Sequence, residues 1–159
     1  MKSFFKNVVQ RKETPGMVGK VLKVGSYMVR IEAQLGEGGF AAIYKVRDNT
    51  TNKAYALKHM RLAGEQEALT DCYTEVDAMK LLAGQPNILA LKAVAFTGSR
   101  GAEQEAYLLL ELCQENLVEY LIRKASPLSD RAVIQIFQCA CRAVAAMHLS
   151  DPPIAHRSA

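Results

Sequence analysis

The sequence predicts an α+β protein in which a five-stranded antiparallel sheet with one packed helix is followed by further helices. Two observations predict this order. Apolar and polar residues alternate with a period of two from Tyr27 onwards, and a helical period replaces the alternation first over residues 69–83 and again from Leu117. The 159 residues, half of them hydrophobic and 23% charged, are typical of one soluble globular domain.

Positive charge is concentrated at the beginning of the chain. Residues 1–30 contain seven Lys or Arg and one acidic residue, Glu13, whereas the rest contains thirteen basic and fifteen acidic residues, within a net charge of +4. We interpret residues 1–26 as a basic lead-in segment and residues 27–159 as the globular domain. A nearly neutral domain argues against a nucleic-acid partner, and no apolar run approaches the roughly 18 residues of a transmembrane segment.

The lead-in segment has one amphipathic pattern. Phe4, Phe5, Val8 and Val9 form a short helical stripe among basic residues. A weak peripheral contact of residues 1–12 with an anionic membrane is one interpretation of this stripe. A frayed terminus is the other, since about three helical turns are barely stable in water.

The chain has four cysteines, Cys72, Cys113, Cys139 and Cys141, and the last two lie in a helical pattern. No His lies at metal-ligand spacing from them, so we expect reduced, buried cysteines and no metal site. Reduced cysteines fit a cytoplasmic compartment.

Three strands are predicted first. Residues 29–35 alternate apolar and polar side chains until the glycine-rich segment 36–39 ends the pattern. Further strands are predicted over residues 42–47 and 54–60, because the residues between them, 48–52, are typical of a turn.

A helix and two more strands follow. Apolar residues at three- and four-residue spacings predict a helix over residues 69–83, which Gly84 ends. Strands are predicted over residues 89–96 and 106–112, around a polar loop formed by residues 97–105.

Two helices are predicted last, a short one over residues 117–123 and a long one that Ser129 caps and that ends near Leu149. The long helix is apolar most of the way round, a pattern typical of a helix that is buried on several sides. Because only ten residues follow it, we expect its far side to be exposed and the domain to be truncated.

Three features point to phosphate chemistry. Small residues in the segment 36–39 would let backbone N–H groups approach a phosphate, although a tight turn alone also accounts for them. Lys58 closes an apolar strand, and Glu75 follows 17 residues later on the predicted helix. A snorkelling lysine and a solvated glutamate would account for each residue separately. Together they also fit a phosphate-binding cation that a carboxylate holds in place.

The order of these features resembles the protein kinase fold. A glycine-rich hairpin, a strand ending Ala56-Leu57-Lys58, a helix with Glu75 and two more strands precede a long helix that leads to His156-Arg157. Gln85-Pro86-Asn87-Ile88 is similar to the turn after the kinase C-helix, and Leu108 to Cys113 is similar to the strand and hinge beside adenine. The resemblance implies a kinase N-terminal lobe followed by the first helices of a truncated C-terminal lobe.

Four shorter matches resemble the numb-associated family, which includes the adaptor-associated and cyclin-G-associated serine/threonine kinases. They are residues 19–25, Gly38-Gly39-Phe40-Ala41, Ala56-Leu57-Lys58 and Pro152-Pro153-Ile154. In that family Ala also stands at the position of Ala41. The resemblance implies a function in clathrin-adaptor and endocytic regulation, with ATP, protein substrates and endocytic adaptors as partners. It also implies a cytoplasmic location, either free or peripheral to membranes and vesicles.

By the same resemblance, Lys58 neutralises the phosphates of ATP and Glu75 positions Lys58. A loop over the phosphates, walls around the adenine and a hinge at its edge complete the implied nucleotide site. These parts are formed by Leu35, Gly36, Glu37, Gly38, Gly39, Phe40, Ala41, Ile43, Ala56, Leu110, Glu111 and Cys113.

One departure from the family pattern concerns activity. Kinases have an Asp after His-Arg that accepts the proton of the substrate hydroxyl, and Ser158 stands at that position here. A Ser cannot act as this base near neutral pH, and the family's Mg²⁺ ligands are missing from residues 1–159. We therefore expect the chain as written to be inactive. The alternative is a non-catalytic, pseudokinase-like module that binds nucleotide or a partner.

Overall fold

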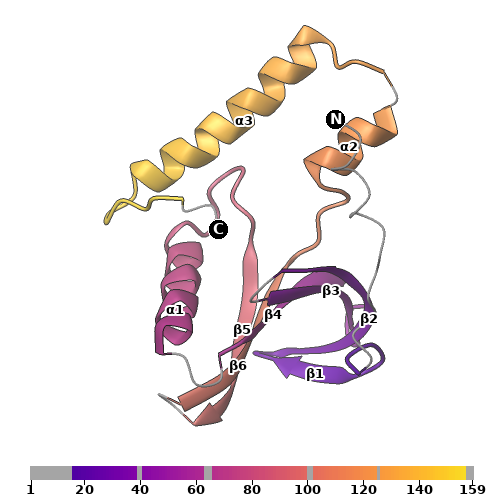
Figure 1. The fold of residues 1–159 in the computed structure, drawn as a ribbon, viewed down its shortest axis with the longest axis vertical. Coiled ribbons are helices and arrows are strands. Elements are labelled where there is room, and N and C mark those ends of the chain that lie inside the picture. The colour runs from indigo at the N-terminus through magenta and orange to yellow at the C-terminus, as the bar shows by residue number, and fades with distance from the viewer. Residues whose placement is uncertain (1–15, 39–40, 63–65, 100–101, 125, 157–159) are drawn as a thin grey trace.

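The computed structural model describes residues 16–38, 41–62, 66–99, 102–124 and 126–156. Within them the chain forms an antiparallel sheet, one helix packed beside it and two further helices (Figure 1), which confirms the predicted α+β class. In chain order the elements are β1 (Val21–Val24), β2 (Tyr27–Glu37), β3 (Ala41–Asp48), β4 (Ala54–Arg61), α1 (Gln66–Leu81), β5 (Leu91–Ser99), β6 (Ala102–Glu111), α2 (Leu117–Lys124) and α3 (Asp130–His148).

The sheet has six strands in the order β1-β2-β3-β4-β6-β5, so the prediction of five strands is wrong. The additional strand, β1, lies inside the segment predicted as a lead-in. It pairs with β2 from Val21 opposite Arg30 to Val24 opposite Tyr27, across a tight turn in which Gly25 has φ +59°. Four residues are too few to show a clear alternation, and only their backbone pairing with β2 identifies them as a strand.

The predicted polar loop over residues 97–105 is also wrong. β5 continues to Ser99 and β6 begins at Ala102, and the two strands pair through Thr97 opposite Glu105. The pairing extends beyond the apolar core, to exposed residues such as Thr97 and Ser99, so backbone hydrogen bonds rather than apolar burial define these positions as strand.

The two faces of the sheet bury separate apolar cores. One core lies on the face that includes Leu57 and Leu109 and is enclosed by strands and by Met17, which precedes β1. The other core lies on the opposite face, where Cys72 and Val76 of α1 pack against Leu108 of β6. Figure 1 shows α1 beside β5 and β6, which places a helix directly against the face that carries Lys58.

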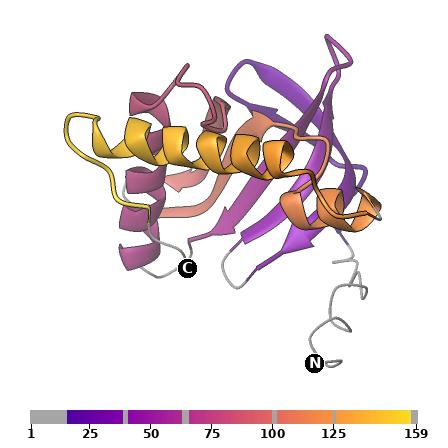
Figure 2. The ribbon, with the colours of Figure 1, turned by 90° about the horizontal axis from the view of Figure 1, so that it is seen from above.

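α2 and α3 lie beyond one end of the sheet, and α3 extends from α2 towards α1 (Figure 2). The predicted cap of α3 is confirmed, since the Ser129 hydroxyl accepts a hydrogen bond from the Ala132 N–H at 3.3 Å. Met147 is the one buried residue within this helix, whereas Val133 and Phe137 are exposed. The predicted exposure of its far side is therefore confirmed.

The expectation of buried cysteines is right for Cys72 alone. Cys113, Cys139 and Cys141 are exposed, because the segment after β6 and most of α3 have little cover. All four thiols are free. None of the helices in the described part of the chain is long and apolar enough to cross a membrane.

Candidate functional site

The register of the sheet brings four predicted site residues onto one face. Lys58 on β4 lies opposite Ile43 on β3 and opposite Leu108 on β6. Two residues earlier on β4, Ala56 lies opposite Leu110. Directly opposed residues of antiparallel strands point to the same face, so Ile43, Ala56, Lys58 and Leu110 share the face that α1 partly covers.

Lys58 and Glu75 form an ion pair across this face. The Lys58 Nζ lies 2.6 Å from Oε1 and 2.7 Å from Oε2 of Glu75, and the two side chains are 22% and 36% exposed. The buried residues Cys72 and Val76 hold α1 against the sheet on either side of Glu75 along the helix. The contact predicted between Lys58 and Glu75 is therefore confirmed, while the roles predicted for them stay predictions.

Cys72 is the titratable group next to this ion pair. Burial, and to a smaller extent the Glu75 carboxylate, raise the pKa of the Cys72 thiol to about 11. The thiol is therefore neutral at physiological pH and is no nucleophile. In this site Cys72 contributes packing rather than chemistry.

The glycine-rich segment connects β2 to β3 at the edge of the same face. β2 ends at Glu37, and the Gly38 N–H donates to the Ala41 carbonyl at 2.8 Å, where β3 begins. Gly39 and Phe40, both predicted to cover the phosphates, lie outside the described residues.

The residues predicted to surround adenine differ in burial. Leu110 is buried, Ile43 and Ala56 are half-buried, and Leu35 is exposed near the end of β2. A Cβ at Gly36 would meet no heavy atom within 4 Å, so the space beside this backbone is open. This face of the sheet is therefore buried at Leu110 and open to solvent at the glycine-rich segment.

The predicted hinge is anchored at its first residue. The Glu111 N–H donates to the Ala90 carbonyl at 3.0 Å, and Glu111 Oε1 accepts from the Ala90 N–H at 2.8 Å. Cys113 follows in an exposed position. The end of β6 is thus tied to the residue that precedes β5, which positions the chain as it leaves the sheet.

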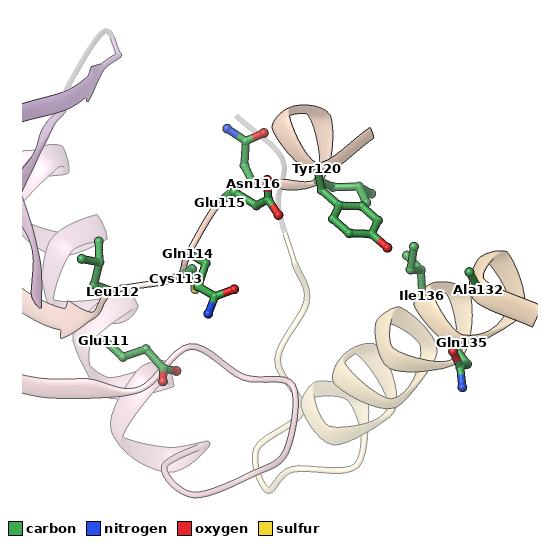
Figure 3. Close-up of a pocket in the computed structure, with 11 residues that line it drawn as sticks. Glu111, Leu112, Cys113, Gln114, Glu115, Asn116, Tyr120, Ala132, Gln135 and Ile136 are labelled. Carbon is green, nitrogen blue, oxygen red and sulfur yellow. The ribbon is translucent and has the colours of Figure 1, made fainter. Parts of the chain in front are cut away.

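An open cavity of about 590 Å³ adjoins this hinge (Figure 3). Figure 3 shows Tyr120 of α2 directed towards Ile136 of α3, across from the hinge residues. Sequence reasoning identified Glu111 and Cys113 but missed the helical residues, because helical periodicity does not reveal which distant segment a helix faces. The cavity is lined by Glu111, Leu112, Cys113, Gln114, Glu115, Asn116, Leu117, Tyr120, Ala132, Gln135 and Ile136.

A polar cluster on the other face of β4 was also missed. His59 Nε2 lies 3.1 Å from Glu105 Oε1, the Tyr107 hydroxyl donates to Glu105 Oε2 at 2.8 Å, and the rings of His59 and Tyr107 stack at 4.7 Å. Burial raises the pKa of Glu105, but the hydrogen bonds from Tyr107 and His59 outweigh it and the pKa is lowered. The cluster ties β4 to β6 at the residue next to Lys58.

Two parts of the predicted chemistry are not placed by the structure. Ser158, at the position of the kinase catalytic base, lies outside the described residues, and His156 before it is exposed. Within the described ranges, no group of three or more His, Cys, Asp or Glu side chains could hold a metal ion.

Comparison with known proteins gives one family match. The profile described as protein kinase domain matches residues 29–158 of this chain, which is most of its length. The match includes β2 to β6, all three helices and the Lys58–Glu75 pair.

Curated relatives with significant similarity carry kinase names. A probable serine/threonine-protein kinase of Dictyostelium discoideum is 35% identical over 87% of this chain, and a second one from the same organism is 36% identical over 91%. Actin-regulating kinase 1 of Saccharomyces cerevisiae is 32% identical over 88%. The chain spans only 12%, 18% and 23% of the lengths of these three relatives.

Proposed function

This chain belongs to the protein kinase family, and from that premise we propose that residues 27–159 form the ATP-binding part of a serine/threonine protein kinase. The observation that carries the proposal is the Lys58–Glu75 ion pair, with Nζ 2.6 Å from the carboxylate. In kinases a lysine held in this way neutralises the phosphates of ATP.

The ion pair is suited to this task because both oxygens of the Glu75 carboxylate contact the Lys58 ammonium. A Glu75 carboxylate that contacts Lys58 through both oxygens restricts the rotamers of the lysine and keeps it on the open face of the sheet. Partial exposure of both side chains leaves the ammonium accessible to a phosphate. Backbone N–H groups of the glycine-rich segment 36–39, other than that of Gly38, which bonds to the Ala41 carbonyl, are proposed to add donors to the same phosphates.

The adenine ring is proposed to lie between the two ends of this face. Leu35, Ile43, Ala56 and Leu110 would contact its apolar surfaces, and the backbone from Glu111 to Cys113 would meet its polar edge. Since the Glu111 N–H already bonds to Ala90, the Glu111 carbonyl and the backbone of Cys113 are the groups proposed for adenine. This arrangement accommodates ATP in the same position as in other kinases.

We also propose that residues 1–159 alone do not transfer phosphate. Ser158 stands where the family has the Asp that accepts the substrate proton, and its hydroxyl is no base near neutral pH. The described residues offer no cluster of acidic ligands for Mg²⁺. Nucleotide binding by this chain should therefore be weak and should depend little on Mg²⁺.

Calorimetry tests the site. The full 159-residue chain is titrated with ATP, with and without Mg²⁺, and is compared with Lys58→Ala and with Lys92→Ala, which removes an exposed lysine of β5. We expect weak binding by the original chain and by Lys92→Ala, and roughly tenfold weaker binding by Lys58→Ala. Tight, strictly Mg²⁺-dependent binding that Lys58→Ala leaves unchanged would refute the site.

The cellular role is proposed from the resemblance to the numb-associated kinases. We propose that the protein acts in endocytic regulation, with endocytic adaptors and protein substrates as partners, in the cytoplasm and at the periphery of membranes. A relative named Actin-regulating kinase 1 supports a regulatory role that involves actin. Affinity capture of a purified clathrin adaptor by this chain tests it, and an adaptor that does not bind contradicts it.

A non-catalytic nucleotide- or partner-binding module is the second candidate function. The observation that favours it is Ser158, since a chain that binds ATP through Lys58 without a catalytic base would be such a module. Because residues 1–159 alone are proposed not to transfer phosphate, incubation of the full-length natural protein with radiolabelled ATP and a general protein substrate separates the two candidates. Transfer of label, lost in Lys58→Ala, supports the kinase, and binding without transfer supports the module.

A further inference from the structure

The outer face of the first three strands is basic at the end remote from the glycine-rich segment. We call Lys23 of β1, Arg30 of β2, and Lys45 and Arg47 of β3 the basic face. Lys23 and Arg30 are exposed, and Lys45 and Arg47 keep more than a third of their side-chain surface in solvent. The sequence shows no such cluster, because these residues are spread over 25 positions.

Strand register places these residues on one surface. Arg30 lies opposite Val21 on β1 and opposite Arg47 on β3. Lys23 is two residues from Val21 and Lys45 is two residues from Arg47, and alternate residues of a strand share a face. Four cations from three strands therefore point the same way.

Acidic residues offset little of this charge. Glu32 is the one acidic partner that the described residues provide, bonding to Arg47 and lying 3.4 Å from Lys45. The other two acidic residues of β2 and β3 lie elsewhere, since Asp48 is buried on the opposite face and Glu37 lies at the glycine-rich end. A net positive charge of three units remains on the basic face.

The positive charge is only partly compensated within the sheet, because Glu32 is shared between Arg47 and Lys45. Arg30 and Arg47 are directly opposed on neighbouring strands, and opposed like charges destabilise a sheet. An anionic partner would convert this repulsion into attraction. The pairing therefore points to a binding surface rather than to a stabilising one.

Basic and acidic residues are distributed unevenly between the first three strands and α1. Residues 16–53, which include β1 to β3, contain six basic and three acidic residues, whereas α1 contains four acidic residues and one basic residue. A large anionic surface would attract the basic face and repel α1. Because α1 covers the same face of the sheet over β4 and β6, this asymmetry favours contact of an extended negative surface with the β1–β2 edge of the face.

Exposed apolar side chains lie among these cations. Val21 and Met28 are each 42% exposed, and Met28 lies opposite Lys23 in the register. Aliphatic side chains interleaved with Lys and Arg match the boundary between lipid headgroups and acyl chains. We propose that the basic face, with Val21 and Met28, docks the protein on an anionic membrane.

The basic face adjoins the proposed nucleotide site on the same face of the sheet, because Lys45 lies opposite Ala56. Arg47 and Ile43 lie on the same face of β3, four residues or about 13 Å apart. The glycine-rich segment is farther still along the strand. Lys23 and Arg30 lie on β1 and β2, separated from Ala56 and Lys58 of β4 by β3, so their variants test membrane contact and Lys58→Ala tests nucleotide binding.

Vesicle sedimentation tests the proposal on the full chain. Neutral vesicles of phosphatidylcholine are compared with vesicles that also contain about 30% phosphatidylserine, at low ionic strength. We expect preferential binding to the anionic vesicles, lost in high salt. Lys23→Gln/Arg30→Gln should lower this partition roughly 25-fold, about fivefold for each cation. Because both side chains are exposed, these substitutions should leave the sheet folded.

A control variant matches the change in charge. Lys92→Gln/Arg142→Gln removes two exposed cations from β5 and α3 and should change the partition no more than about twofold. Equal losses in the two double variants would overturn the proposal. An unchanged partition in Lys23→Gln/Arg30→Gln would also overturn it, and would assign membrane binding to another segment.

Two further measurements distinguish a membrane from an acidic protein partner and from the nucleotide site. Val21→Ser/Met28→Ser should weaken binding to anionic vesicles severalfold but should leave binding to a soluble Glu-rich peptide unchanged. A chain that binds this peptide and ignores anionic vesicles would overturn the proposal in favour of an acidic protein partner. Lys58→Ala should bind vesicles as the original chain does, so failure of the nucleotide site and failure of the basic face are distinguishable.

Discussion

The sheet with α1 and the two later helices contain similar apolar residues, but they differ in how these are covered. Leu57 and Leu108 in the sheet are fully buried, whereas Ile122 on α2 and Phe137 on α3 are 65% and 68% exposed. Among the described residues, Met147 is the only buried apolar residue beyond β6.

The difference shows what an apolar pattern specifies. The apolar side chains of alternating strands are buried when other elements cover the face on which they lie. In this protein the curled sheet buries one face and α1 covers part of the other. An amphipathic helix likewise defines an apolar stripe, but the stripe does not say which surface covers it. Ile136 on α3 faces the hinge cavity, whereas Val133 and Phe137 face solvent.

The largest expected effect is the loss of stability when a core residue of the sheet is truncated. Leu57→Ala should lower the free energy of unfolding by roughly 2–5 kcal/mol, because it leaves a cavity among strands that enclose it completely. Phe137→Ala on α3 should change it by no more than about 0.5 kcal/mol. Urea denaturation followed by circular dichroism measures both, and similar losses would contradict the contrast between the two regions.

A second prediction concerns the junction of the sheet and α1. Glu75→Gln should weaken ATP binding about tenfold, because the neutral amide no longer holds the Lys58 ammonium in place. Glu67→Gln, which removes an exposed carboxylate from the first turn of the same helix, should leave the affinity unchanged. Calorimetry compares them, and equal affinities in both variants would contradict the positioning role of Glu75.

A third prediction sharpens the contrast at the helices. The 159-residue chain should bind a hydrophobic dye and should sediment as oligomers, because α2 and α3 expose many large apolar residues. Val133→Ser/Phe137→Ser should reduce dye fluorescence by about half, and Val21→Ser on the sheet should reduce it little. A monomer that ignores the dye would contradict this prediction.

The smallest expected effect is on the pH dependence of stability, and it concerns Glu105 and Glu115, two carboxylates whose pKa is lowered. In Glu105, hydrogen bonds from Tyr107 and His59 outweigh the effect of burial, and in Glu115 the hydrogen bond from Arg123 dominates. A lowered pKa stabilises the fold above the unfolded value of about 4.3, and this stabilisation is lost as the pH falls through the folded pKa.

The measurement is the stability of Glu105→Gln and Glu115→Gln from pH 7 to pH 3. Glu105→Gln should be less stable than the original chain at pH 7, with the difference closing below about pH 4. Glu115→Gln should differ little throughout, because its partner Arg123 is exposed on α2. A difference for Glu105→Gln that stays constant over this range would contradict the assignment.

Much of the fold was predictable from local patterns. The predicted core of each strand from β2 to β6 and of each helix was correct, because period two and period 3.6 are properties of neighbouring residues. β1 and the extension of the β5–β6 hairpin were missed for one reason. Their pairing partners supply the hydrogen bonds, and the residues themselves are too few or too polar to show a pattern.

The candidate site divides in the same way. The order of the glycine-rich segment, Lys58 and Glu75 predicted the ion pair correctly. Lys58 and Glu75 are only 17 positions apart, on a strand and on the helix that follows it, so few arrangements of these two elements are possible. The His59–Glu105–Tyr107 cluster could not be predicted, because 46 residues separate His59 from Glu105 and only the β4–β6 register joins them.

By itself the sequence determined the α+β class, the order of the elements and the series of motifs that the protein kinase family shares. Each of these depends on residue spacing along the chain. The tertiary structure alone decided that Arg30 lies against Arg47, that Tyr120 and Ile136 line the hinge cavity, and that Phe137 faces solvent. These features depend on register and packing between distant segments, which periodicity does not encode.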